Sequence, residues 1–253
     1  MRAPHPPLKQ YYQTEAERGG WVRHLFDRTA GDYHRVERLM AFGTGSWYRR
    51  RALARAGLGP GMRVLDIGSG TGLTACEAAR LSGDARLVTG IDPCVGMVRC
   101  ARVPPGLAMK LGSAEAIPAE AHSADFLSMG YALRHIGDLP AALHEFKRVL
   151  VPGGRLCLLE ITRPEGRLAR SLLRAYMRGF VPWMARGLAQ HRDTPQLMRY
   201  YWDTIDACVS PAEILAAIAQ AGFVGARRHL ELGIFSEYCA RAPAADAVAS
   251  LPD

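Results

Sequence analysis

Residues 63–72, Arg-Val-Leu-Asp-Ile-Gly-Ser-Gly-Thr-Gly, pass from an apolar strand pattern directly into three glycines at alternate positions. Glycine lets the backbone turn tightly and come close to a ligand where any Cβ would collide. Twenty residues after the last glycine, Asp92 ends a second apolar run. An acid at the end of a second strand can accept hydrogen bonds from both hydroxyls of a ribose. The stretch therefore predicts a strand, a glycine turn and a helix that hold a ribose-bearing ligand.

The spacing of the glycines separates two classes of ligand. A dinucleotide-binding turn reads G-x-G-x-x-G and places a pyrophosphate at the N-terminus of the helix. Gly68, Gly70 and Gly72 give G-x-G-x-G instead, with Asp66 just before them and no lysine to meet a phosphate. An acid beside the turn favours a cationic ligand without phosphate. The plain alternative is that the glycines and the acid only form a tight connection between a strand and a helix.

The stretch resembles motif I of the class I S-adenosylmethionine-dependent methyltransferases, whose cofactor carries a sulfonium, an amino-acid end and an adenosine. The resemblance implies S-adenosyl-L-methionine as the cofactor and a cofactor site around the glycine turn and the second acid. The residues expected to bind it there are Asp66, Gly68, Ser69, Gly70, Gly72, Asp92 and Pro93.

The length and composition predict one large globular domain. The chain has 253 residues, 49% of them hydrophobic, and no linker divides it. The N-terminus has no apolar signal core and no apolar stretch is long enough to span a membrane, so we expect a cytoplasmic protein. The six cysteines show no C-x-x-C spacing, which indicates reduced thiols and no metal site.

The net charge of +8 does not by itself indicate a nucleic-acid partner. Arginines are spread along the chain, unlike a track that follows phosphates, and we expect no binding of nucleic acid. One denser stripe recurs at helical intervals and consists of Arg163, Arg167, Arg170, Arg174 and Arg178. Such a stripe is typical of a solvated helix face, and contact with anionic lipid or a protein partner is the alternative.

Strand and helix patterns alternate along most of the chain. Strands are predicted at 63–67, 86–91, 106–110, 125–130, 155–161, 224–230 and 235–239. Helices are predicted at 73–81, at 139–150 and at 211–220, and a further helix begins at 95. Pro152-Gly-Gly should stop the helix at 139–150. This order predicts an α/β fold with a doubly wound, mostly parallel seven-stranded sheet and helices on both faces. The ligand belongs at the carboxyl ends of its strands.

Four parts of one domain, residues 1–253, are expected around this sheet. Residues 1–57 form an N-terminal helical cap after a loose, proline-rich start, and residues 58–162 form the cofactor-binding core. Residues 163–208 interrupt the alternation with helical, aromatic-rich sequence, which is typical of a lid over a substrate. Residues 209–253 supply the last helix and strands.

Further segments resemble the successive motifs of the ubiquinone/menaquinone biosynthesis C-methyltransferases. They are Leu25-Phe-Asp-Arg-Thr-Ala-Gly-Asp-Tyr, Ser113-Ala-Glu-Ala-Ile-Pro, Tyr131-Ala-Leu-Arg-His-Ile-Gly-Asp, Ala142-Leu-His-Glu-Phe-Lys-Arg-Val-Leu-Val-Pro-Gly-Gly and Leu159-Glu-Ile-Thr-Arg-Pro. The resemblance covers roughly residues 25–240. It implies a Rossmann-like fold and methylation of a small phenol- or quinol-type aromatic substrate at a ring carbon. It also implies that Tyr33, Ser113, Ala114, Glu115 and Tyr131 complete the cofactor site.

The chain departs from that family at informative positions. Ser113 stands where an aspartate usually holds the adenine amino group, and His135 stands where the family's Leu-Arg-Asn carries asparagine. The residues after 231 also differ from the family's glycine-rich ending. These differences indicate a shared scaffold and chemistry with a different aromatic substrate.

In the methylation of a phenol ring carbon, one base can serve two steps. Removing the hydroxyl proton activates the ring, and a ring proton must leave afterwards. His135, at the end of a predicted strand beside the cofactor, is the candidate base, and Arg134 the candidate to hold a phenolate or a bridging water. The alternative is that His135 caps the helix starting near Asp138 and that Arg134 pairs with an acid such as Glu160.

Several functional classes stay open from the sequence. A small-molecule O- or N-methyltransferase of secondary metabolism would use the same cofactor pocket and align a different substrate atom. A protein that keeps the fold as a scaffold in a biosynthetic complex, without methylating anything, is a further class. The sequence also leaves open whether the chain forms a homodimer and whether it makes a peripheral membrane contact.

Overall fold

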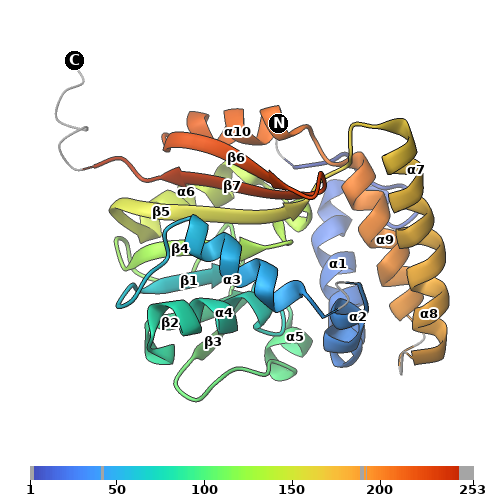
Figure 1. Ribbon diagram of the computed structural model, residues 1–253, viewed down its shortest axis with the longest axis horizontal. Helices are drawn as coiled ribbons and strands as arrows, with labels where there is room; N and C mark the ends of the chain where they lie inside the picture. The colour runs from blue at the N-terminus through green and yellow to red at the C-terminus, as the bar shows by residue number, and fades with distance from the viewer. Residues whose placement is uncertain (1–2, 41–42, 189–190, 192, 245–253) are drawn as a thin grey trace.

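The computed structural model describes residues 3–40, 43–188, 191 and 193–244. Its strands are β1 (Val64–Ile67), β2 (Val88–Asp92), β3 (Ala108–Leu111), β4 (Ala124–Gly130), β5 (Leu150–Ile161), β6 (Val224–Glu231) and β7 (Phe235–Arg241). They form one sheet in the order β3-β2-β1-β4-β5-β7-β6 (Figure 1). Neighbours from β3 to β5 are parallel, and β7 is antiparallel to both β5 and β6. The predicted doubly wound, mostly parallel seven-stranded sheet is confirmed.

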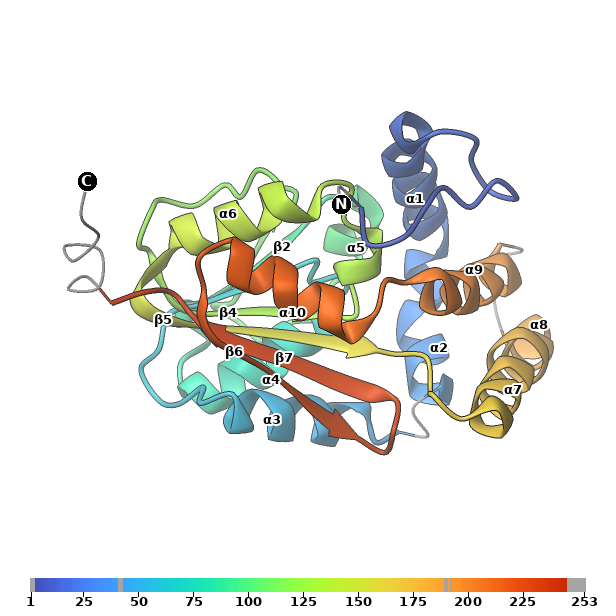
Figure 2. The ribbon, with the colours of Figure 1, turned by 90° about the horizontal axis from the view of Figure 1, so that it is seen from above.

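Helices cover both faces of the sheet. Helices α3 (Gly45–Arg55) and α4 (Leu73–Ser82) lie on one face, and α6 (Leu139–Val149) and α10 (Pro211–Gln220) lie on the other (Figure 2). The first pair buries small side chains such as Ala52 and Ala75, which let both helices lie close together against the sheet. The second pair buries Phe146, Ile214 and Ile218 at helical spacing. Removing these apolar faces from water supplies the main driving force for the layered core.

A cap of helices lies beyond the carboxyl ends of the parallel strands (Figures 1 and 2). It contains α1 (Glu15–Thr29), α2 (Tyr33–Met40), α7 (Arg167–Ala175), α8 (Val181–Leu188) and α9 (Thr194–Ala207), with a π-turn at Tyr176–Phe180 between α7 and α8 and a 3-10 turn at Ala30–Asp32. The short helix α5 (Val95–Arg99) follows β2 at the same end. Within the described ranges, no helix is both long and apolar enough to cross a membrane.

Two strand boundaries differ from the sequence pattern. Residues 152–154 were expected to stop a helix before a strand beginning at Arg155, but α6 ends at Val149 and β5 already begins at Leu150. Leu150 pairs with Ala124 and Arg155 with Phe126, so the proline and glycines form a bulge of extra residues in β5 and the backbone stays in the sheet. At the second strand, Ala85–Leu87 form a 3-10 turn and delay the strand until Val88.

The N-terminal segment is not the loose start that its prolines suggested. His5 and Tyr12 are 1% and 2% exposed. The Tyr11 hydroxyl donates a hydrogen bond of 2.7 Å to Asp203 on α9, and the Val209 amide donates to the Pro4 carbonyl at 2.8 Å. The prolines prevent this segment from forming a helix. Its aromatic side chains pack against an apolar surface of the cap, and this burial orders the segment.

Candidate active site

The glycine turn and the acid that predicted the fold meet at the ends of β1 and β2. Gly68 and Gly70 have φ angles of +64° and +58°, and Gly72, at +88°, precedes the first turn of α4. Asp92 accepts hydrogen bonds from the Gly70 amide at 2.7 Å and the Cys94 amide at 2.8 Å. Each carboxylate oxygen keeps a lone pair for a further donor, because a carboxylate offers about four acceptor positions.

These residues line a cavity at the carboxyl ends of the strands, between the sheet and the cap. The predicted cofactor residues that line it are Tyr33, Gly68, Gly70, Asp92, Pro93, Ser113, Ala114, Glu115 and Tyr131. Asp66, Ser69 and Gly72 do not line it. Asp66 is fully buried beneath the turn, where its carboxylate accepts a 2.7 Å hydrogen bond from Ser128, and burial raises its pKa to about 6.

The cavity fits a cofactor that carries a ribose. A Cβ built on Gly70 would meet no atom within 4 Å, so the space that glycine leaves open belongs to the cavity that Gly70 lines. The Asp92 carboxylate stands at the end of β2, where a ribose hydroxyl pair can donate to it. Glu115 accepts hydrogen bonds from the Gly137 amide at 2.9 Å and the Asp138 amide at 3.3 Å. These bonds hold the segment that contains Ser113 and Ala114 against the residues that precede α6. The residues present therefore fit S-adenosylmethionine.

A second cavity of about 220 Å³ adjoins the first, and both are lined by Tyr33, Tyr131 and Tyr201. The remaining wall is mostly apolar and comes from the cap, the start of α3 and the ends of β5, β6 and β7: Trp47, Tyr48, Ile161, Leu173, Tyr176, Met177, Ile205, Leu232, Ile234 and Phe235, with Glu37, Thr44, Gly45, Arg49, Arg134 and Glu231. Tyr131 has a φ of +62°, which costs a residue with a Cβ about 1–3 kcal/mol. Its amide still donates to the Leu159 carbonyl at 2.8 Å, so the sheet holds this strained residue between the two cavities.

His135 lines the first cavity and ends the 3-10 turn Leu133–His135 that follows β4. Its Nδ1 lies 3.3 Å from the Tyr200 hydroxyl, and its ring stacks on the Tyr200 ring. Its Nε2 is buried without a hydrogen-bond partner in the described part of the chain. Burial, reinforced by the Arg134 charge, lowers the pKa of His135 well below 6.5. A neutral ring with its proton on Nδ1 would leave Nε2 able to accept a proton from a ligand.

His135 does not cap helix α6. The cap of α6 is Asp138, whose side chain accepts a 3.1 Å hydrogen bond from the Ala141 amide.

Arg134 points away from His135 and lines the second cavity. It is 2% exposed, lies 2.5 Å from Glu160 at the end of β5, and donates from Nε to the Thr204 hydroxyl on α9 at 3.2 Å. Burial raises the pKa of Glu160 to about 7, against the opposing charge of Arg134. The pairing with Glu160, which the sequence left as the alternative, is therefore present and joins the sheet to the cap.

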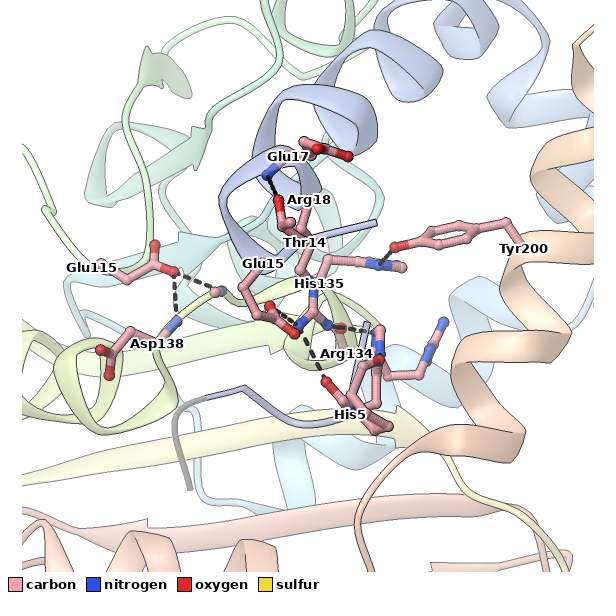
Figure 3. Close-up of polar contacts among 12 residues, drawn as sticks. His5, Thr14, Glu15, Glu17, Arg18, Glu115, Arg134, His135, Asp138 and Tyr200 are labelled. Carbon is pink, nitrogen blue, oxygen red and sulfur yellow. Dashed lines mark hydrogen bonds and ion pairs between the residues drawn. The ribbon is translucent and has the colours of Figure 1, made fainter. Parts of the chain in front are cut away.

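Sequence reasoning missed a buried link between α1 and the turn that carries His135 (Figure 3). Arg18, 1% exposed, donates hydrogen bonds of 2.9 Å to the Arg134 carbonyl and 3.1 Å to Glu15, and lies 2.5 Å from the His5 ring. Burial lowers the pKa of His5 to about 4, so this imidazole is neutral and able to accept from Arg18. An arginine in the first turn of an amphipathic helix gives no sequence signal of such burial.

Among the described residues, one group of potential metal ligands lies within 4.8 Å, and it consists of His229, Glu231 and Glu237. Arg55 donates to Glu231 at 3.0 Å and to Glu237 at 3.3 Å. The Arg55 guanidinium already pairs with both carboxylates, so the group is an ion-pair network.

Asp92→Ala is expected to weaken binding of S-adenosylmethionine by about 30- to 150-fold. A charged acceptor shared by two hydroxyls contributes about 2–3 kcal/mol, and the same change frees the Gly70 and Cys94 amides that shape the turn. Calorimetric titration measures the change, with Asp84→Ala as the matched control, since Asp84 lies on a surface turn and pairs with Arg86. Unchanged affinity in a folded Asp92→Ala protein would rule out the ribose assignment.

Comparisons with known proteins give a consistent result. A model of the "ubiE/COQ5 methyltransferase family" matches residues 12–240. The chain is 33% identical over 223 residues to a "Ubiquinone/menaquinone biosynthesis C-methyltransferase UbiE" of Syntrophotalea carbinolica, covering 86% of this chain and 92% of that protein. It is 30% identical over 220 residues to a "Demethylmenaquinone methyltransferase" of Symbiobacterium thermophilum, covering 82% and 86%. A solved structure from Thermotoga maritima, described as a "SAM-dependent methyltransferase, possible histamine N-methyltransferase", shares the fold with a TM-score of 0.61 at 21% identity, covering 87% of this chain and 98% of that one.

Proposed function

The chain belongs to the ubiE/COQ5 methyltransferase family and is an S-adenosylmethionine-dependent methyltransferase, and from this premise we propose that it methylates a quinol-type substrate at a ring carbon. The observation that carries the proposal is the junction of the two cavities at Tyr33, Tyr131 and Tyr201. One cavity fits the cofactor, and the other offers an apolar space for an aromatic ring and its substituents.

The cofactor, when bound, supplies a methyl group on a positively charged sulfur, and the protein's part is to align a nucleophile with it and exclude water. Asp92 and the glycine turn fix the cofactor's ribose. Phe26 on α1 and Tyr201 on α9 line the cofactor cavity, so aromatic rings of the cap cover part of it. Little covalent machinery is needed once the ring is oriented.

His135 is proposed as the base. His135 lines the cofactor cavity and its Nε2 has no partner in the described part of the chain, so it can accept the hydroxyl proton of a quinol. Once it has returned that proton to the ring oxygen or passed it to solvent, it can accept the ring proton that leaves after methylation, so that one proton is released overall. Arg134 is proposed to act on the side of the second cavity, where its charge favours an ionised ring oxygen. Its pairing with Glu160 fixes the orientation of the guanidinium but leaves less of its charge for a substrate.

Incubation with S-adenosylmethionine and a reduced demethylmenaquinone is expected to add one methyl group to the quinol. Mass spectrometry detects the gain. Air oxidation then identifies the atom, because a C-methylated quinol keeps both hydroxyls and re-forms a quinone, whereas an O-methylated quinol does not. An O-methylated product would transfer the assignment to oxygen. Cofactor binding without any product from a series of quinols and phenols would favour a scaffold role.

The other partner assignments stay predictions. Lack of nucleic-acid binding and a homodimer have no direct support from the described residues. A peripheral membrane contact is supported by the cap, which exposes large apolar side chains beside arginines.

A further inference from the structure

One face of the cap exposes large apolar side chains that no described part of the chain covers. Leu168 and Leu172 on α7 are 74% and 63% exposed, Phe180 in the π-turn is 44% exposed, and Trp183 on α8 is 67% exposed. Leu168 and Leu172 are four residues apart on α7, and Phe180 and Trp183 are three residues apart around the start of α8, so the members of each pair lie on one side of the chain there. We call the surface that these four side chains form the α7–α8 face. Figures 1 and 2 place these two helices at the outer edge of the molecule.

Exposed arginines flank the α7–α8 face. Arg167 and Arg174 have no carboxylate partner in the described ranges, and Arg178 pairs with Asp203 only at 3.7 Å. Two other arginines of the predicted stripe are engaged, since Arg163 donates to the Asp206 carbonyl and Arg170 pairs with the Asp206 side chain. The free positive charge therefore lies beside the apolar side chains, on α7 and at its end.

We propose that the α7–α8 face docks on an anionic lipid surface. Exposed leucines and a tryptophan on consecutive helices, with arginines beside them, fit the boundary between headgroups and acyl chains, where the apolar side chains enter and the guanidinium groups meet phosphates. A second copy of the chain fits less well. A two-fold contact brings the same face of both copies together, so it would place the unpaired Arg167 and Arg174 of one copy near those of the other.

The same helix also forms a wall of the second cavity. Leu173 and Tyr176 line that cavity, while Leu168 and Leu172 are exposed to solvent. Trp47 and Leu232 line it too and are 52% and 80% exposed, so the rim of the cavity is itself apolar. Docking would bring this rim close to the lipid, and an apolar substrate could enter without crossing water. This last consequence rests on the proposed function, whereas the docking itself does not.

Flotation with lipid vesicles tests the docking without any substrate. The full chain should bind vesicles that contain phosphatidylglycerol, bind pure phosphatidylcholine weakly, and lose affinity as salt rises. Leu172→Ser with Trp183→Ser should lower the affinity by about tenfold or more, because both side chains are lost from the lipid boundary. The matched control is Val224→Ser with Leu230→Ser, two exposed apolar residues of β6, and it should bind like the natural chain.

Arg167→Gln with Arg174→Gln should lower the affinity for phosphatidylglycerol vesicles by about 30-fold. Arg227→Gln with Arg241→Gln, two exposed arginines of the last strands, is the control for charge.

Three results would overturn the proposal. The natural chain could fail to bind anionic vesicles, or both control pairs could lose as much affinity as the test pairs. The chain could also form a dimer in sedimentation that Leu172→Ser with Trp183→Ser dissolves, which would assign the face to a second copy. Vesicle binding without methylation of any quinol would leave the docking in place and contradict the proposed function. Methylation without vesicle binding would support the proposed function and contradict the docking.

Discussion

Gly70→Val is expected to abolish binding of S-adenosylmethionine while the chain stays folded. Gly70 lines the cofactor cavity, and a Cβ built on it would meet no atom of the described chain within 4 Å. The valine side chain would therefore occupy volume that the cofactor needs. We expect the affinity to fall by more than about 100-fold, below detection by calorimetric titration.

The left-handed backbone at this position needs its own control. Valine at a φ of +58° costs about 1–3 kcal/mol of stability wherever it occurs. Gly83, at the end of α4, has a φ of +80° and also has nothing within 4 Å of a built Cβ, but it does not line the cavity. Gly83→Val should lower the unfolding temperature similarly and bind the cofactor normally. If Gly70→Val also binds normally, the cofactor lies elsewhere.

His135→Ala is expected to lower turnover by about 10²-fold with little change in cofactor affinity. A positioned base contributes about 10²- to 10⁴-fold, and a base of low pKa belongs at the lower end. His135→Asn places the family's residue at this position, so it should retain more activity than the alanine form if a water can carry the proton. Rates at saturating substrate and the cofactor dissociation constant separate a chemical effect from a binding effect.

The pH dependence follows from the buried state of His135. Its lowered pKa keeps the ring neutral, and able to act as a base, below pH 6.5, so the activity of the natural chain should decline only well below that pH. In the same range an unfolded chain would protonate this ring, so acid also favours unfolding. Ellipticity measured at each pH separates the two effects. The acid limb that belongs to the base should be absent in His135→Ala.

Near-natural rates in both His135 variants would contradict a base at this position. Proton transfer would then fall to another group or to solvent, and alignment of the ring would carry the rate. A variant that fails to fold would be recognised by its thermal unfolding, and His135→Asn, which keeps a polar side chain beside Tyr200, is the milder change for that purpose.

The sequence could predict that the glycine turn and Asp92 meet at one cavity, because their positions depend on short-range chemistry. The positive φ angles of Gly68 and Gly70 are needed wherever a strand turns this tightly into a helix, and Asp92 follows at a distance set by one strand–helix unit. Tyr131 was named through the resemblance, but its own positive φ had no signal, since a residue with a Cβ rarely adopts it.

The sequence by itself determined the alternation of strands and helices, and with it the parallel sheet and the end of the sheet at which the glycine turn and Asp92 meet. Its periodicity is local, and so are the glycine turn and the acid after β2. The tertiary structure alone decided which way Arg134 and His135 face, because their partners Glu160 and Tyr200 lie far along the chain. It also decided that the proline-rich start is ordered and that Arg18 is buried, since both depend on surfaces that exist only after the cap has packed. Burial set the low pKa of His135 for the same reason: the dielectric around a side chain is a property of its neighbours in space, and the sequence names only its neighbours along the chain.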